Sequence, residues 1–208
     1  MQRISPRRNR VSPFGEIERA PYRGTLMGNR GDLHDELGGL GRTWRLRRWI
    51  SCRLDCVGQS GVTFDTPGHY YPLFFTDEAV ALAAGHRPCA MCRRPAFEEF
   101  REAWGYAAGH DNRVPADAID HELHFERLPA TKEKPIWTLS DLPDGCFFTQ
   151  RDAPAVARLV WREKQFKWRA GSYELVPSLR SSTKVSVVTP WPLVGVLRAG
   201  YQPQMRVP

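Results

Sequence analysis

The chain has no long apolar run, no secretory segment and few lysines. No stretch of its 208 residues approaches the roughly 18 consecutive apolar residues of a membrane-spanning helix, so we expect no membrane partner. The N-terminal segment MQRISPRRNR lacks the apolar core of a secretory signal, which favours a cytoplasmic protein. Apolar residues still make up 41% of the sequence, enough for one large domain or two small ones.

Lysine is scarce because arginine supplies most of the positive charge. Only five of the 30 basic residues are lysines, and the net charge is +7. The planar guanidinium of arginine pairs with phosphate oxygens and stacks on flat rings. Arginines cluster at 3–10, at 42–48 among tryptophans, and at 87–94. This pattern favours nucleic acid, most simply DNA, over the alternative of an arginine-rich solvated surface. The residues that we expect to contact DNA are Arg45, Arg47, Arg48, Arg53, Arg87, Arg93 and Arg94.

Four of the five cysteines form two close pairs, Cys52 with Cys56 and Cys89 with Cys92. Each pair supplies two thiolates from one tight turn, and the intervening loop can bring the pairs together around a tetrahedral Zn²⁺ ion. Disulfides are the alternative, but the unpaired Cys146 and a reducing cytoplasm favour metal. We therefore predict a zinc site with these four cysteines as ligands.

The patterning predicts an α+β fold with a strand-rich C-terminal half. Capping and periodicity indicate helices at 76–84, from Pro95 through Trp104, from Asp117 onward, and at 192–199. A hairpin is expected over 62–75, and short strands at 142–150, 157–168, 172–177 and 184–190. We expect a flexible basic arm over residues 1–24, a zinc domain with a helical extension over 25–130, and a strand-rich region over 131–208.

The segment FFTDEAVALAAGHRPCAMCRRP (74–95) resembles the second half of the Ada-type metal-binding domain, and CRLDC (52–56) is similar to its Cys-Arg-x-x-Cys. The resemblance covers about residues 43–105. It implies a four-cysteine zinc domain that binds the DNA backbone and takes a methyl group from a methylphosphotriester. The acceptor role falls on Cys52. Zinc would keep such a thiol ionised at neutral pH.

This chain differs from the Ada pattern at several points. His86 stands where the family has an aromatic residue, and the loop over 57–88 is longer. Neither a helix-turn-helix nor a Pro-Cys-His-Arg motif is present, so we do not expect a transcriptional or base-repair role. His86 and His69 are alternative ligands in place of Cys56.

Two other segments hold histidines and acids. In IDHELHFER (119–127), Asp120 and His124 share a helix face with His121 nearby, and His34 lies in the acidic loop GNRGDLHDE (28–36). Such groups indicate either acid–base catalysis or an ordinary polar surface. The second hypothesis is therefore a nuclease-like enzyme with a structural zinc, in which either Asp120, His121 and His124 or His34 carry out the chemistry. The third is a non-catalytic zinc module that mediates protein contacts.

Overall fold

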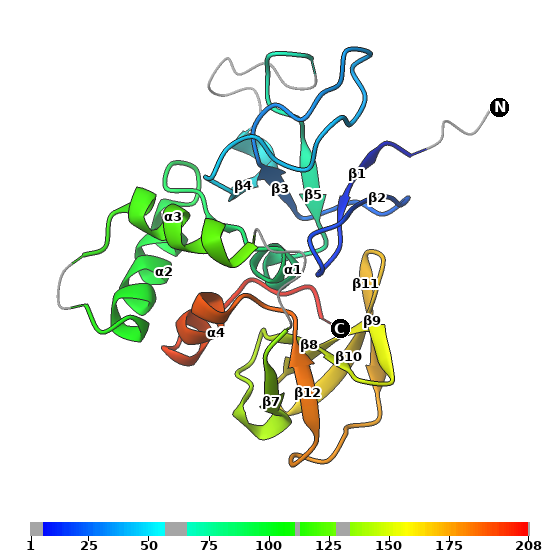
Figure 1. The fold of residues 1–208 in the computed structure, drawn as a ribbon, viewed down its shortest axis with the longest axis vertical. Coiled ribbons are helices and arrows are strands. Elements are labelled where there is room, and N and C mark those ends of the chain that lie inside the picture. The colour runs from blue at the N-terminus through cyan, green and yellow to red at the C-terminus, as the bar shows by residue number, and fades with distance from the viewer. Residues whose placement is uncertain (1–5, 57–65, 111–112, 128–133, 208) are drawn as a thin grey trace.

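The computed structural model describes residues 6–56, 66–110, 113–127 and 134–207 (Figure 1). Helices and two sheets make up these residues, which confirms the α+β fold. In Figure 1 the first sheet lies at the top, the second at the lower right, and α2 and α3 at the left. None of the helices within the described ranges is long and apolar enough to cross a membrane.

The first sheet carries the cysteines and has the strand order β2-β1-β5-β3-β4-β6. Met27 is the register partner of Cys52 on one side and of Phe74 on the other, and Phe74 in turn is level with Arg10. These four side chains therefore share one face of the sheet, while Leu26, Phe75 and their neighbours on the other face enter a core. The strands are β1 (Arg8–Val11), β2 (Ile17–Arg19), β3 (Leu26–Asn29), β4 (Ile50–Arg53), β5 (Leu73–Phe75) and β6 (Arg87–Pro88).

The N-terminal segment is not the flexible arm that we predicted, as far as the structure describes it. β1 and β2 pair in antiparallel fashion, and Val11 and Ile17 are buried in the core. A bulge between Arg8 and Arg10 interrupts the alternation of side chains. Because of this bulge and the shortness of both strands, the sequence lacks the regular alternation of apolar and polar residues that would have predicted strands here.

The second sheet confirms the strand-rich C-terminal half and has the order β11-β10-β9-β8-β12-β7. The run at 157–168, predicted as one strand, is a hairpin of β9 and β10. Arg162 and Glu163 form its turn, both with positive φ (49° and 62°), as a tight two-residue hairpin turn requires. The strands are β7 (Ile136–Thr138), β8 (Phe147–Gln150), β9 (Ala153–Trp161), β10 (Lys164–Arg169), β11 (Ser172–Val176) and β12 (Lys184–Val187).

Four α-helices pack between and beside the sheets in the described ranges: α1 (Glu78–Ala83), α2 (Arg94–Ala107), α3 (Ala116–Arg127) and α4 (Trp191–Arg198). Asp77, rather than Thr76, caps α1 by accepting a hydrogen bond from the backbone N–H of Val80. Short 3₁₀ turns cover Leu54–Cys56 (η1) and Leu139–Asp141 (η2). Of the predicted hairpin at 62–75, β5 is the strand within the described residues, and 57–65 lies outside them.

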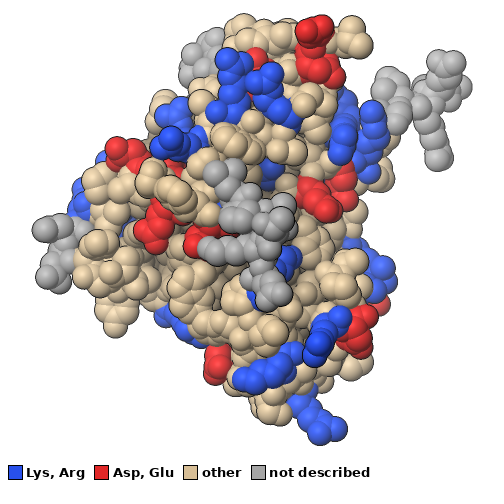
Figure 2. Space-filling model, viewed as in Figure 1, with Lys and Arg blue, Asp and Glu red and all other residues tan. Residues whose placement is uncertain are grey.

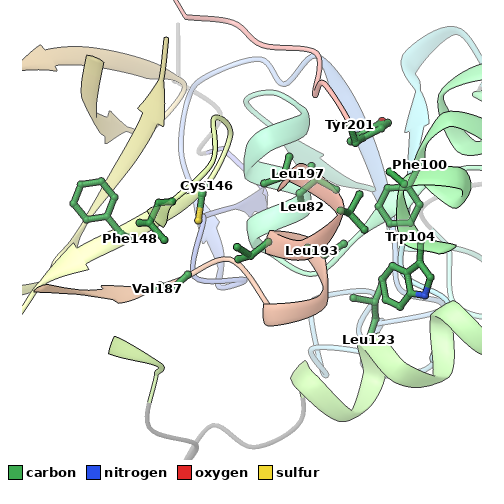
Figure 3. Close-up of a cluster of buried hydrophobic side chains, with 14 of the residues drawn as sticks. Leu82, Phe100, Trp104, Leu123, Cys146, Phe148, Val187, Leu193, Leu197 and Tyr201 are labelled. Carbon is green, nitrogen blue, oxygen red and sulfur yellow. The ribbon is translucent and has the colours of Figure 1, made fainter. Parts of the chain in front are cut away.

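A shared apolar core joins α4 to α2 and to the second sheet (Figure 3). Phe100 and Trp104 of α2 pack near Leu193 and Leu197 of α4, and Phe148 of β8 belongs to the same cluster. The two halves of the chain are therefore held together by apolar packing.

Two adjacent buried acids at the start of α1 tie the C-terminal residues to the first half. One oxygen of Asp77 accepts from the Tyr173 hydroxyl (2.8 Å) and from the Arg206 backbone N–H (3.1 Å). Glu78 accepts from the Tyr201 hydroxyl (2.6 Å) and the Gln204 backbone N–H (2.9 Å), and pairs with Arg93 (2.8 Å). Burial raises the pKa of Asp77, and the hydrogen bonds that Asp77 accepts offset part of this rise.

Replacing Glu78 by Ala should lower the free energy of unfolding by about 3–5 kcal/mol, because Arg93 would keep a buried charge without a counter-charge. Urea denaturation followed by tryptophan fluorescence measures the change. Glu174→Ala is the matched control, since Glu174 forms an ion pair of similar length (2.9 Å) with Arg169 at the surface. It should cost less than about 1 kcal/mol. Equal losses in the two variants would contradict the structural role of Glu78.

Candidate metal centre

Three cysteine side chains converge at one edge of the first sheet. Cys52 lies on β4, and Cys89 follows β6 directly. These two strands run parallel with Ser51 level with Pro88, and the Cys89 backbone N–H donates to the Ser51 carbonyl (3.0 Å). The turn that leads into α2 then brings Cys92 back, with the Arg93 N–H bonded to the Cys89 carbonyl (3.1 Å). As a result, the sulfur atoms of Cys52, Cys89 and Cys92 all lie within 4.8 Å of one another.

Hydrogen bonds among the three cysteines shift their pKa values in opposite directions. A hydrogen bond from Cys52 lowers the pKa of Cys89 to about 5, and this same interaction raises the pKa of Cys52. Burial raises the pKa of Cys92 to about 11. The arrangement therefore favours a thiolate on Cys89. Metals that prefer sulfur bind the thiolate form, so this set of sulfur donors fits a thiolate-binding metal.

The fourth predicted ligand, Cys56, lies beside this group but not within it. It ends η1 and is half-buried, and its contact with Cys92 contributes to the raised pKa of Cys92. Among the described residues, no other three His, Cys, Asp or Glu side chains come close enough together to hold a metal ion.

The two histidines considered as substitute ligands lie outside the cysteine group. His86 is fully buried between the rings of Trp49 and Phe75 and accepts a hydrogen bond from Arg30 (3.1 Å). Burial lowers the pKa of His86 well below its usual value, so it remains neutral. His69 is exposed and lies 3.1 Å from the Thr66 hydroxyl.

Buried ion pairs fix the strands that carry the cysteines. Arg93 donates to the Ser51 hydroxyl (2.9 Å) and pairs with Glu78. Arg87 makes a bidentate pair with Asp120 (2.9 and 2.7 Å). Arg87 and Arg93 are only 2% and 4% exposed, so neither can contact DNA as predicted. Ser51 and Glu78 were not among the predicted site residues, because neither stands in a distinctive motif; their role follows from their buried positions on β4 and α1.

The other predicted DNA contacts are exposed. Arg45, Arg53 and Arg94 each pair with a nearby carboxylate, on Asp32, Asp55 and Glu98. Arg47 and Arg48 precede β4 and form no ion pair with a carboxylate within the part of the chain that the structure describes, although the charge of Arg48 acts to lower the pKa of Asp120. On the face shown in Figure 2, basic side chains are dispersed and acidic ones lie among them. Unpaired positive charge near the cysteines is therefore concentrated on Arg47 and Arg48.

The proposed acid–base pair on α3 is not assembled. Both Asp120 oxygens are occupied by Arg87, and no hydrogen bond joins Asp120 to His124 among the described residues. His124 packs against the ring of Trp44 (4.7 Å between centroids), and burial lowers its pKa. His121 packs against Phe125 instead. His34 is a separate case, since its Nδ1 lies 2.7 Å from Asp32 in the first half of the chain. The enzyme hypothesis thus gains no support on α3.

No protein-family model, curated protein or solved structure matches this chain. The likeness to the Ada-type domain therefore rests on the motif alone, and the cysteine geometry is the main evidence on function.

Purified protein should contain about one metal ion per chain, and Cys89→Ser should lose it because the cluster then keeps only two thiolates. Elemental analysis with thiol counting measures this. Cys146→Ala is the control: Cys146 is fully buried in the C-terminal core, where burial raises its pKa to about 12. The hypothesis of a metal site would be wrong if both variants carried as much metal as the parent protein.

Proposed function

We propose that this protein binds zinc through Cys52, Cys56, Cys89 and Cys92 and contacts the DNA backbone beside that centre. The observation that carries the proposal is the convergence of three sulfur atoms within 4.8 Å from segments almost 40 residues apart. Two thiols from one turn are common in proteins, but a third from a distant strand at this range is the arrangement of a structural metal site. The Ada resemblance supports the same ligands.

Cys56 supplies the fourth ligand in this proposal. It is the remaining cysteine of the first pair, half-buried and in contact with Cys92. Four thiolates give a closed shell, which is the usual form of a structural zinc site. With zinc bound, the centre carries a charge of about −2, and this charge needs basic neighbours on any surface that approaches phosphate.

Arginines near the centre meet this need. Arg47 and Arg48 are exposed just before the strand of Cys52. Arg53 follows Cys52 and Arg94 lies two residues after Cys92, and both are exposed but already pair with carboxylates. Guanidinium groups at such positions pair with backbone phosphates without reading sequence. We therefore expect binding that depends on charge and varies little with DNA sequence.

Methyl acceptance by Cys52 is the second candidate function, and the Ada resemblance is its basis. In this reaction the Cys52 sulfur forms a bond to the methyl carbon while the bond from carbon to the phosphotriester oxygen breaks. That oxygen keeps the electron pair, which leaves a phosphodiester. Cys52 is only 7% exposed, so a substrate methyl finds little sulfur surface. For this reason the geometry supports backbone binding more strongly than methyl transfer.

DNA binding should weaken steeply with salt, and Arg47→Gln/Arg48→Gln should lower both affinity and salt dependence. Each lost phosphate contact reduces the slope of log affinity against log salt by roughly 0.9, so the double variant should lose about 2. Fluorescence anisotropy with a labelled duplex measures both. Arg151→Gln/Arg180→Gln removes two exposed arginines of the C-terminal half and should leave the slope unchanged. A salt-independent affinity would favour a module for protein contacts.

Zinc-loaded protein incubated with methylphosphotriester DNA should gain one methyl group on the peptide that contains Cys52. Peptide mass spectrometry detects the transfer, and Cys52→Ser should abolish it. A methyl on Cys56 or Cys92, which are more exposed, would move the acceptor role to another ligand of the same centre. Absence of methyl from all four peptides would remove methyl transfer while leaving DNA binding intact.

A further inference from the structure

A hollow of about 290 Å³ opens at the edge of the first sheet opposite to the cysteines. The strand order places β2 and β1 at this edge and β4 and β6 at the other. The hollow belongs to neither the cysteine centre nor its flanking arginines. Its lining residues are Arg7, Arg8, Arg19, Asp35, Gly39, Leu40 and Tyr71.

The charges around this hollow are unbalanced. Arg8 and Arg19 are direct cross-strand partners, and like charges placed opposite each other destabilise a sheet. Neither has a carboxylate partner within the described residues. Asp35 is the only acid in the lining, and its Oδ1 accepts from the backbone N–H groups of Leu37 (3.0 Å) and Gly39 (2.7 Å). The guanidinium groups of Arg8 and Arg19 against the carboxylate of Asp35 leave an excess of one positive charge.

Backbone contacts hold the guanidinium groups of Arg8 and Arg19 in place. Arg8 Nε donates to the Ile17 carbonyl (2.9 Å), and one terminal nitrogen of Arg19 donates to the Pro6 carbonyl (3.1 Å). Tyr71 is buried below them and donates its hydroxyl to the Arg8 carbonyl (2.9 Å). Because these bonds use neutral acceptors, they orient the cations without neutralising them. Orienting them beforehand reduces the entropy lost when an anion binds.

We propose that this hollow binds a phosphate group. Guanidinium forks match the oxygens of phosphate in geometry and charge, and several forks around a small hollow can bind one such group together. Asp35 also lines a wider depression of about 650 Å³ with His34, Glu36 and Arg42, which leaves room for the rest of a phosphorylated molecule. The phosphate can come from a nucleic-acid backbone or from a free phosphate compound. The site does not depend on the proposed zinc centre.

Pyrophosphate and inorganic phosphate are the probes, titrated at constant ionic strength against chloride. Amide chemical shifts in NMR should show saturable changes at Arg8, Arg19 and Tyr71. Arg8→Gln/Arg19→Gln should weaken pyrophosphate binding at least about tenfold, because two charge-assisted contacts are lost. Arg8→Lys/Arg19→Lys keeps the charge but loses the forks, and should bind with intermediate affinity.

Arg151→Gln/Arg180→Gln is the matched control, with the same loss of charge far along the chain, and should bind pyrophosphate like the parent protein. Equal weakening in this control, or no saturable shift at the hollow with either probe, overturns the proposal.

A titration with duplex DNA then identifies the source of the phosphate group. If Arg8→Gln/Arg19→Gln also weakens DNA binding, the phosphate is that of a nucleic acid; if only pyrophosphate binding falls, it belongs to a free phosphate compound. Repeating the titration with Cys89→Ser separates this site from the zinc centre, since pyrophosphate should still bind.

Discussion

The buried ion pair between Glu78 and Arg93 connects the cysteine turn to the rest of the molecule. Arg93 follows Cys92 directly, and its guanidinium reaches Glu78 at 2.8 Å while also donating to Ser51, the neighbour of Cys52. Glu78 in turn accepts from Tyr201 and Gln204 near the C-terminus. A buried charge without its partner is costly, so each of these groups requires the others. The relative positions of Cys52, Cys89 and Cys92 are thus set by contacts that reach the far end of the chain.

Arginine serves as a core residue in this protein as well as a surface cation. Arg30 is 1% exposed, donates to the Gly15 and Thr43 carbonyls and lies 4.0 Å from the centroid of the Trp49 ring. Arg127 lies 4.6 Å from the centroid of the same ring. Burial lowers the pKa of both groups to about 9, so they stay charged at neutral pH and depend on carbonyls and the indole face for stabilisation. Part of the high arginine content therefore serves the structure. Because buried arginines count toward the net charge of the chain, that net charge is larger than the positive charge available at the surface to bind a polyanion.

The sequence predicted the features that depend on contacts between residues close in sequence better than those that depend on distant residues. Asp77 and Gly85 delimit α1 through local hydrogen bonding and backbone conformation, so this helix was predictable to within two residues. The convergence of Cys89 and Cys92 with Cys52 followed from spacing. The burial of Arg87 and Arg93 did not, because it depends on Asp120 and Glu78, which are distant in sequence or carry no distinctive pattern. The turn at Arg162 and Glu163 was missed because neither residue is a usual choice for positive φ.

Short edge strands explain why the chemistry of the first sheet gathers at its margins. β6 has only two residues and β2 only three, so the chain turns away from the sheet at once on both sides. On one side this turn presents Cys89 and Cys92 beside Cys52; on the other, β1 and β2 present Arg8 and Arg19 around a hollow. The central strands β5 and β3 pack against the core through Leu73, Phe75 and Leu26, which keeps both margins in a fixed relation. The two margins differ in burial: Cys52 and Cys89 are each only 7% exposed, whereas Arg8 and Arg19 are exposed and can meet groups from outside the protein. The rigid middle of the sheet therefore positions two separate sites without belonging to either of them.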